Sequence, residues 1–431
     1  IYQCDWSSDV CSSDLATGST ANINYVMQAA GAALNPGALG TSTIALPGTV
    51  TVDNTWGGGT PATGYITTAN IATYAVAGVG ATINNAIYAA GDITIKGAAN
   101  GSQGITYTAT IDSLAGDVTL RGLTTTNYGV YTSNTSLIAG NNISITGLAS
   151  GSTAGWTVLA GALTINSGSS NANITITATE GSAGSSNGLY QSGAITGANG
   201  TNLTFTSNNN INQTGAISLP ANTTSSDATI TYNTTSGNLN SAITGGNLTV
   251  ATGSTSPVNY LMKAAGGALN PGAITVPGSI TLDNSWGGVS PATGYITASN
   301  LTTYATTGVG VLVNGALNAG TGVSIIGVTN GNYSVEIISS IVSYTGAISI
   351  TGIATNYGIY SNVYGTINAL SNALTITGTS TTGQAVNLSG PITANAITIS
   401  ATGTTASTIS TLAGAITINQ MYVSEIGRAH V

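Results

Sequence analysis

The segments "GDITIKG" (91–97), "GDVTLRG" (116–122) and "NNISITG" (141–147) decide the fold predicted for this chain. In each, two aliphatic residues flank a Thr or Ser, and each segment begins 25 positions after the one before it. Alternation of apolar and polar residues over three to five positions is typical of a short strand that buries one face. Related segments recur as far as "GAITI" at 414, so we expect short strands along nearly the whole chain.

The spacing of these strands favours one all-β architecture over two others. A sandwich or barrel needs longer strands and a turn about every 8–12 residues, and a propeller needs blades of about 40–50 residues. A parallel β-helix (β-solenoid) needs short strands and about 20–25 residues per coil. We therefore predict a β-solenoid with aliphatic residues inside, Thr outside and Gly or Asn at the corners. At that coil length the chain would form roughly 16–20 coils.

A much longer repeat divides the chain. "ATGSTANINYVMQAAGAALNPGA" begins at Ala16 and returns, slightly changed, as "ATGSTSPVNYLMKAAGGALNPGA" from Ala251. "VDNTWGGGTPATGYITTANIATYA" begins at Val52 and returns as "LDNSWGGVSPATGYITASNLTTYA" from Leu282. We therefore predict one solenoid repeat unit at 16–250 and a second, shorter one at 251–423. The segments "YVMQAAGAALNPG" and "YLMKAAGGALNPG" are alternatively short helices, although internal glycines disfavour this.

The two ends differ in composition from the rest of the chain. Asp9–Leu15 can be written in codons whose complementary DNA strand encodes Glu425–Val431. One short DNA sequence read in both directions thus accounts for both ends, as expected of a translated sequencing adapter. We therefore interpret residues 1–15 and 424–431 as artefactual, non-native segments and exclude them from functional reasoning. The alternative is a Cys4–Cys11 disulfide that would indicate secretion.

The charge content excludes several kinds of partner. Only 4% of the residues are charged, and the formal net charge is −8. Nucleic-acid binding requires clustered Lys and Arg, so no nucleic-acid partner is expected. No apolar run approaches the roughly 20 residues that cross a bilayer, so no direct membrane insertion is expected either. No cofactor or metal site is predicted, since His and Cys occur only in the terminal segments.

The densest group of charges lies near the first repeated segments. At 25 residues per coil, Asp92 would stack near Asp117 and Lys96 near Arg121, with Asp112 close by in sequence. Neighbouring carboxylates can bind Ca²⁺ or serve as catalytic acids, but we interpret these residues as exposed corner residues and predict no catalytic residue. The second copy supports this interpretation, because the matching positions are uncharged: Gly322, Ala347, Ile326 and Thr351.

The words "DNTWGGGTPATGY" and "DNSWGGVSPATGY" are the most distinctive in the sequence. An aromatic ring beside a polar group on a loop can bind a sugar. The alternative is a Trp that packs over a loop and covers one side of the coil. Six residues form the predicted glycan-binding set, three from each copy: Trp56, Tyr65, Asp53, Trp286, Tyr295 and Asp283.

The segments "AGDITIKG", "AGNNISITG" and "GQAVNLSGPITANAITISATG" resemble the β-strand-repeat passenger segments of filamentous-haemagglutinin-like and autotransporter adhesins. The resemblance implies a right-handed parallel β-helix, export by a Gram-negative bacterium and attachment at the outer cell surface. We therefore expect a non-enzymatic structural or adhesive rod, a fragment of a larger secreted protein. Its partners would be host or environmental glycans or surface proteins, and its translocator or adhesive domains would lie outside this sequence. The alternatives are an ice-binding or S-layer-like Thr-rich solenoid and, less favoured, a polysaccharide-degrading β-helix enzyme.

Overall fold

The computed structural model describes residues 22–56, 66–150, 157–166, 168–180, 188–234, 241–285, 296–370, 372–419 and 423–426, with side chains up to Ile409. The chain is all-β, with 52% strand and 2% helix, and its parallel strands stack as a β-solenoid of about 13 turns. This confirms the predicted fold class. The chain divides into two compact units, Ile1–Ser218 and Leu219–Val431, and each is described by itself.

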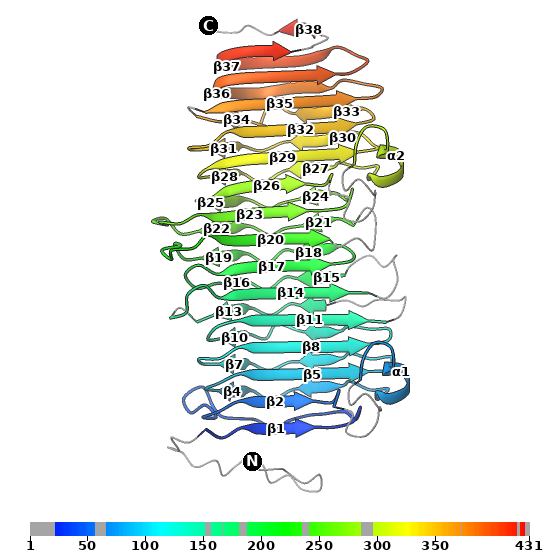
Figure 1. The fold of residues 1–431 in the computed structure, drawn as a ribbon, viewed down its shortest axis with the longest axis vertical. Helices are drawn as coiled ribbons and strands as arrows, with labels where there is room; N and C mark the ends of the chain where they lie inside the picture. Colours follow the sequence, from blue (N-terminus) through cyan, green and yellow to red (C-terminus); the bar gives the residue numbers. More distant parts are fainter. Residues whose placement is uncertain are drawn as a thin grey trace. The chain divides into compact units, whose positions relative to one another are not determined.

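In the first unit each complete turn contributes one strand to each of three faces. Strands of the same face pair in parallel with the turns before and after, as β5, β8 and β11 do (Figure 1). The first face contains β1 (Tyr25–Gln28), β2 (Val50–Asp53), β5 (Ile93–Ala99), β8 (Val118–Thr124), β11 (Ile143–Ala149), β14 (Asn173–Thr179) and β17 (Asn202–Ser207). The second face contains β3 (Ala81–Ile83), β6 (Ile105–Tyr107), β9 (Val130–Thr132), β12 (Thr157–Leu159), β15 (Leu189–Gln191) and β18 (Ile211–Gln213). The third face contains β4 (Ile87–Ala89), β7 (Ile111–Ser113), β10 (Leu137–Ala139), β13 (Leu163–Ile165), β16 (Ile195–Thr196) and β19 (Ile217–Leu219).

The second unit is built in the same way. Its first face contains β20 (Ala228–Thr234), β23 (Val258–Lys263), β26 (Ser279–Asp283), β29 (Gly322–Thr329), β32 (Ile348–Ala354) and β35 (Ala373–Ser380). The second face contains β21 (Ile243–Thr244), β24 (Leu269–Asn270), β27 (Val311–Val313), β30 (Tyr333–Ile337) and β33 (Tyr357–Ser361). The third face contains β22 (Leu248–Val250), β25 (Ile274–Val276), β28 (Leu317–Ala319), β31 (Ile341–Ser343) and β34 (Ile367–Asn368). Strands β36 (Val386–Thr402) and β37 (Ser407–Asn419) are longer and continue from face to face, and the short strand β38 (Val423–Ile426) pairs with β37.

The core is a stack of small branched side chains, because register places like residues above one another. In β8 the burial alternates from Val118 to Leu120 with the polar Thr119 on the outside. One column of fully buried residues follows the first face of the first unit: Val52, Ile95, Leu120, Ile145, Ile176 and Phe205. Burial of such side chains is the main favourable contribution to folding.

Glycine at the end of the repeated segment is required by a close approach of two backbones. A Cβ atom on Gly122 would overlap the carbonyl oxygen of Gly129, where the chain passes from β8 to β9. Gly97 has the same relation to Gly104 one turn earlier. The final glycine of "GDITIKG" and "GDVTLRG" therefore allows the tight corner between the first and second faces.

The turns vary in length more than the expected 20–25 residues. Hydrogen bonds between stacked corner residues span 20 positions for Ser279 and Asn259 and 31 positions for Asn173 and Asn142. One turn in each unit is longer still. Asn54 bonds to Ala98 in the first unit and Asn284 bonds to Val328 in the second, and each bond spans 44 positions. The expectation of roughly 16–20 coils was therefore wrong, since longer turns use more residues for each coil.

Each of the two longest turns contains a short helix. Helix α1 (Ile71–Tyr74) packs Ile71 against Ile66, Ala98 and Leu123. Helix α2 (Leu301–Tyr304) packs Leu301 in the same way in the second unit. These helices lie in the "DNTW" and "DNSW" turns. The alternative helical segments, residues 25–37 and 260–272, contain no helix and begin in strands β1 and β23. Within the described residues, no helix has the length and apolar character needed to cross a membrane.

The compact units do not coincide with the repeat units read from the sequence. The second compact unit begins at Leu219, whereas the repeated sequence begins again at Ala251. Of the two segments interpreted as non-native, residues 1–15, with both cysteines, and 427–431 lie outside the described residues. The strand β38, which includes Glu425, pairs in parallel with β37.

Candidate functional site

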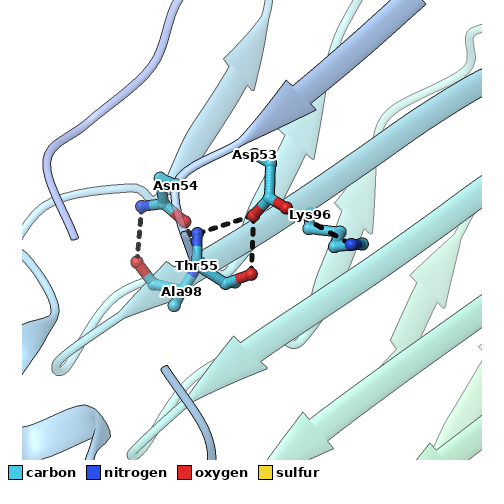
Figure 2. Close-up of polar contacts among 5 residues, drawn as sticks. All are labelled: Asp53, Asn54, Thr55, Lys96 and Ala98. Carbon is cyan, nitrogen blue, oxygen red and sulfur yellow. Dashed lines mark hydrogen bonds and ion pairs between the residues drawn. The ribbon is translucent and has the colours of Figure 1, made fainter. Parts of the chain in front are cut away.

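The Asp-Asn turn that ends β2 gathers most of the buried polar groups near the predicted site. Asp53 is only 2% exposed. One of its carboxylate oxygens accepts hydrogen bonds from the backbone N–H of Thr55 (2.8 Å) and from the Thr55 hydroxyl (2.6 Å), as Figure 2 shows. These bonds within two residues are typical of an Asx turn, in which the side chain shapes the backbone. Asp53 thus holds the chain where it leaves the first face.

The next residue ties the same turn to the following coil. The side chain of Asn54 is fully buried, donates to the carbonyl of Ala98 at 2.9 Å and accepts from the Ala98 N–H at 2.6 Å (Figure 2). An amide side chain can imitate a peptide unit in this way, because it carries one acceptor and two donors. Asn54 therefore continues the ladder of hydrogen bonds where the regular strand pairing stops.

An ion pair stands beside this turn. The Nζ atom of Lys96 lies 3.3 Å from the second carboxylate oxygen of Asp53, and Lys96 is the in-register neighbour of Asp53 on β5. The lysine side chain is 32% exposed, so solvent screens much of the attraction. The pair neutralises a buried carboxylate, which is costly to leave without a partner.

The second unit contains the same turn, but the lysine next to its aspartate comes from a different coil. Asp283 accepts from the N–H (2.9 Å) and hydroxyl (2.6 Å) of Ser285, and Asn284 bonds to Val328 as Asn54 bonds to Ala98. Ile326 now occupies the position of Lys96, in register with Asp283 on the next coil. A lysine, Lys263, occupies the in-register position on the preceding coil instead. Each buried aspartate thus has a lysine one coil away, on opposite sides in the two units.

The structure describes three of the six residues predicted to bind a glycan: Asp53, Trp56 and Asp283. Asp53 and Asp283 are buried, with carboxylate oxygens engaged inside the turn, so they do not face a ligand at the surface. Trp56 is 42% exposed and lies just beyond the turn. The other three predicted residues, Tyr65, Trp286 and Tyr295, lie outside the described residues. A sugar-binding role for the tryptophans stays a prediction, with Trp56 as its exposed member.

The acids grouped by sequence do not form one site. Lys96 is in register with Arg121, as the 25-residue spacing predicts. Asp92 accepts a hydrogen bond from the backbone N–H of Asp117 at 2.9 Å, one coil away on the first face. Asp112 lies on β7 of the third face, where burial raises the pKa of its carboxyl group.

Asp92 and Asp117 belong to a ladder of side chains along one corner. The Asp117 oxygen accepts from the backbone and side-chain nitrogens of Asn142, and Asn142 accepts in turn from Asn173. Each carboxylate or amide therefore accepts a hydrogen bond from a backbone N–H at, or one residue before, the start of the strand on the next coil. Among the described residues, no group of three or more His, Cys, Asp or Glu side chains is arranged to hold a metal ion.

Rows of hydroxyl groups cover the outer side of the first face. Successive in-register positions in the first unit are hydroxyl residues: Thr51, Thr94, Thr119, Ser144, Thr175 and Thr204. A second row, two residues further along each strand, contains Thr146, Thr177 and Thr206 but begins with Asp53, Lys96 and Arg121. In the first unit the hydroxyl array is therefore two rows wide over β11, β14 and β17, and in the second unit it is again two rows wide over β32, β35 and β36.

A cluster of tyrosines on the second face was not predicted. The ring of Tyr333 lies 5.2 Å from that of Tyr357 and 4.7 Å from that of Tyr360, measured between centroids. In the first unit Tyr128 and Tyr131 form a pair at 5.2 Å. The signal was present in the sequence, because "TNYGVY" and "TNYGIY" occur in both copies, but stacking with Tyr333 depends on strand register.

Comparisons with protein-family models, with curated proteins and with solved structures give no match for this chain.

Proposed function

We propose that this chain is a non-enzymatic structural and adhesive segment of a secreted bacterial surface protein. The observation that carries the proposal is the use of the polar side chains at the corners. The conspicuous ones, such as Asp53, Asn54 and Asn142, are engaged in bonds that join one coil to another. Polar groups that bond one coil to the next are suited to a scaffold. Because each coil stabilises only its neighbours, such a stack can lengthen by duplication. The 235-position repeat fits that mode of growth.

Location at the outer surface of a Gram-negative bacterium belongs to the same proposal. It is supported by the resemblance to adhesin passenger segments and by the scarcity of charge. Neutral Thr and Asn side chains on the outer faces keep a long parallel stack soluble without attracting counter-ions. The partners would be glycans or proteins of another surface.

Attachment of beads tests the adhesive function. Beads coated with the full chain should be retained on host-cell or polysaccharide-coated surfaces under flow, and beads coated with a non-adhesive protein of similar size should wash off. Incubation of the chain with the same polysaccharides should release no new reducing ends. Equal wash-off of both bead types, or measurable release of reducing ends, would contradict the proposal.

The hydroxyl rows favour ice binding as a second candidate function. Over β11, β14 and β17 the paired rows repeat at about 4.8 Å between strands and about 6.7 Å along them, a regular two-dimensional lattice of hydroxyls. Thr177 stands at the centre of this lattice. Thermal hysteresis of the full chain, reduced in Thr177→Tyr and retained in a variant of the third face such as Ile138→Thr, would support this function. Freezing behaviour identical to that of a non-binding protein would exclude it.

A further inference from the structure

The tyrosine cluster of the second unit places three aromatic rings beside the carboxylate of Glu336 on one outer face. Tyr333 on β30 is in register with Tyr357 on β33, and Glu336 on β30 is in register with Tyr360. All three tyrosines are half-buried, so part of each ring remains accessible. We define Tyr333, Glu336, Tyr357 and Tyr360 as the tyrosine platform.

Polar groups flank the platform on both sides of Tyr360. Glu336 lies one coil before it, and Asn387 lies one coil after it. Among the described residues, the Glu336 carboxylate forms no hydrogen bond or ion pair, unlike Asp53, Asp92 and Asp117. A half-buried carboxylate with no partner in the protein is available to accept hydrogen bonds from a ligand.

The first unit retains part of the same arrangement. Tyr128 and Tyr131 correspond to Tyr357 and Tyr360 in register and in sequence. The rings of Tyr128 and Tyr131 are tilted by 32° at 5.2 Å, whereas those of Tyr357 and Tyr360 meet edge-on, at 65° and 6.4 Å. Thr106 occupies the position next to Tyr131 that Glu336 occupies next to Tyr360. Between the two copies Lys96 and Arg121 are replaced by uncharged residues, whereas this tyrosine pair is kept. The second unit then adds a third ring and a carboxylate.

We propose that the tyrosine platform binds an uncharged glycan, with the pyranose rings lying on Tyr333 and Tyr360 and their hydroxyl groups donating to Glu336. Aromatic rings with one polar edge are suited to ligands that have an apolar face and a polar rim, as sugars do. An anionic glycan would be repelled by the carboxylate, and the chain as a whole carries a formal charge of −8. This inference deepens the proposed adhesive function and rests on it.

Titration calorimetry with the full chain tests the platform directly. The probes are cellohexaose, mannohexaose and chitohexaose in its N-acetylated form, with a heparin oligosaccharide as the anionic comparison. We expect at least one neutral probe to bind. Tyr360→Ala should weaken that binding about tenfold, whereas Tyr360→Phe should keep it within about twofold, because stacking needs the ring. Glu336→Gln should weaken binding with the rings intact.

Tyr344→Ala is the matched control, because Tyr344 is 54% exposed on the loop after β31, away from the second face. It should bind like the unmodified chain. Unchanged circular dichroism and melting of each variant would separate loss of the site from loss of the fold. The inference is overturned if no neutral probe binds, if heparin binds better than every neutral probe, or if Tyr360→Ala and Tyr344→Ala behave alike. Retention of beads under flow together with any of these results would overturn the platform alone, whereas probe binding without bead retention would overturn the adhesive function alone.

Discussion

The side-chain amide of Asn54 forms two hydrogen bonds with the backbone of Ala98, 44 positions later in the sequence. Asn284 and Val328 repeat the relationship in the second unit at the same separation. Both asparagines follow a buried aspartate and open the longest turn of their unit. The hydrogen-bond ladder of the first face thus extends through a side chain where the backbone departs to form an expanded loop.

Replacing Asn54 by Ala should loosen this turn selectively. The variant leaves the N–H and carbonyl of Ala98 buried without partners, which costs about 2–4 kcal/mol. Hydrogen exchange measured by mass spectrometry should show faster exchange in peptides from β5. The matching peptides from β29, where Asn284 is unchanged, provide an internal reference. Uniform protection in both would show that the side chain contributes nothing to the turn.

The corner glycines should differ sharply in their tolerance of a methyl group. Gly122→Ala would place a Cβ atom on the carbonyl oxygen of Gly129, so the backbone must shift, at a cost above about 3 kcal/mol. A Cβ atom added at Gly78 would have no other atom within 4 Å, so Gly78→Ala should change the stability by less than about 0.5 kcal/mol. Thermal unfolding of both variants makes the comparison. Similar melting temperatures would contradict the close approach of Gly122 to the carbonyl group of Gly129.

The buried column should be more sensitive than the hydroxyl row that faces outward from the same strand. Leu120→Ala removes a fully buried side chain from the middle of the column and should cost about 2–5 kcal/mol. Thr119→Ala, one residue away on the outer side, should cost less than about 0.5 kcal/mol. Because coils support only their neighbours, the faster hydrogen exchange in Leu120→Ala should be concentrated in β5, β8 and β11.

Alkaline pH should destabilise the fold through buried tyrosines. Burial raises the pKa of Tyr107 above its ordinary value of 10.0, and it does the same for Tyr232 and Tyr260. A raised pKa in the folded state means that the neutral form is favoured there, so the stability contribution is complete below about pH 10. It is lost as the pH rises above that value, because the unfolded chain then releases the proton more readily.

Tyrosinate absorbance and circular dichroism recorded together check this expectation. A late group of tyrosines should ionise only as the β signal disappears, and Tyr107→Phe should reduce the loss of stability between neutral and alkaline pH. Ionisation of every tyrosine with the β signal intact would refute it.

The strands themselves were predictable from local pattern. In "GDVTLRG" the alternation of Val118, Thr119 and Leu120 predicts the inward and outward faces that the structure shows. The 25-residue spacing predicts the stacking of Ile93, Val118 and Ile143, and that register is found. These features follow from sequence because each depends on neighbours two residues away or on one regular coil.

The site residues were less predictable. The pairing of Asp53 with Lys96 crosses the expanded turn, and neither this pairing nor the burial of Asp53 is indicated by the residues next to it in sequence. Asp112 was grouped with Asp92 and Asp117. Asp112 lies on β7 of the third face, however, and the chain turns a corner before β8 of the first face begins at Val118. Proximity in sequence did not indicate a shared face, because each coil changes direction within a few residues.

Taken by itself, the sequence determined that the chain forms short strands with aliphatic residues on one side, since period-two alternation leaves no other way to bury Ile, Val and Leu in so short a segment. Only the tertiary structure decided which outward side chains meet, such as Tyr333 with Tyr360 and Asp53 with Lys96. Those contacts depend on how many residues each coil uses. A longer loop costs little extra free energy, and its length is not indicated by the alternation of apolar and polar residues. The register across a long turn is therefore determined by the packing of the stacked coils.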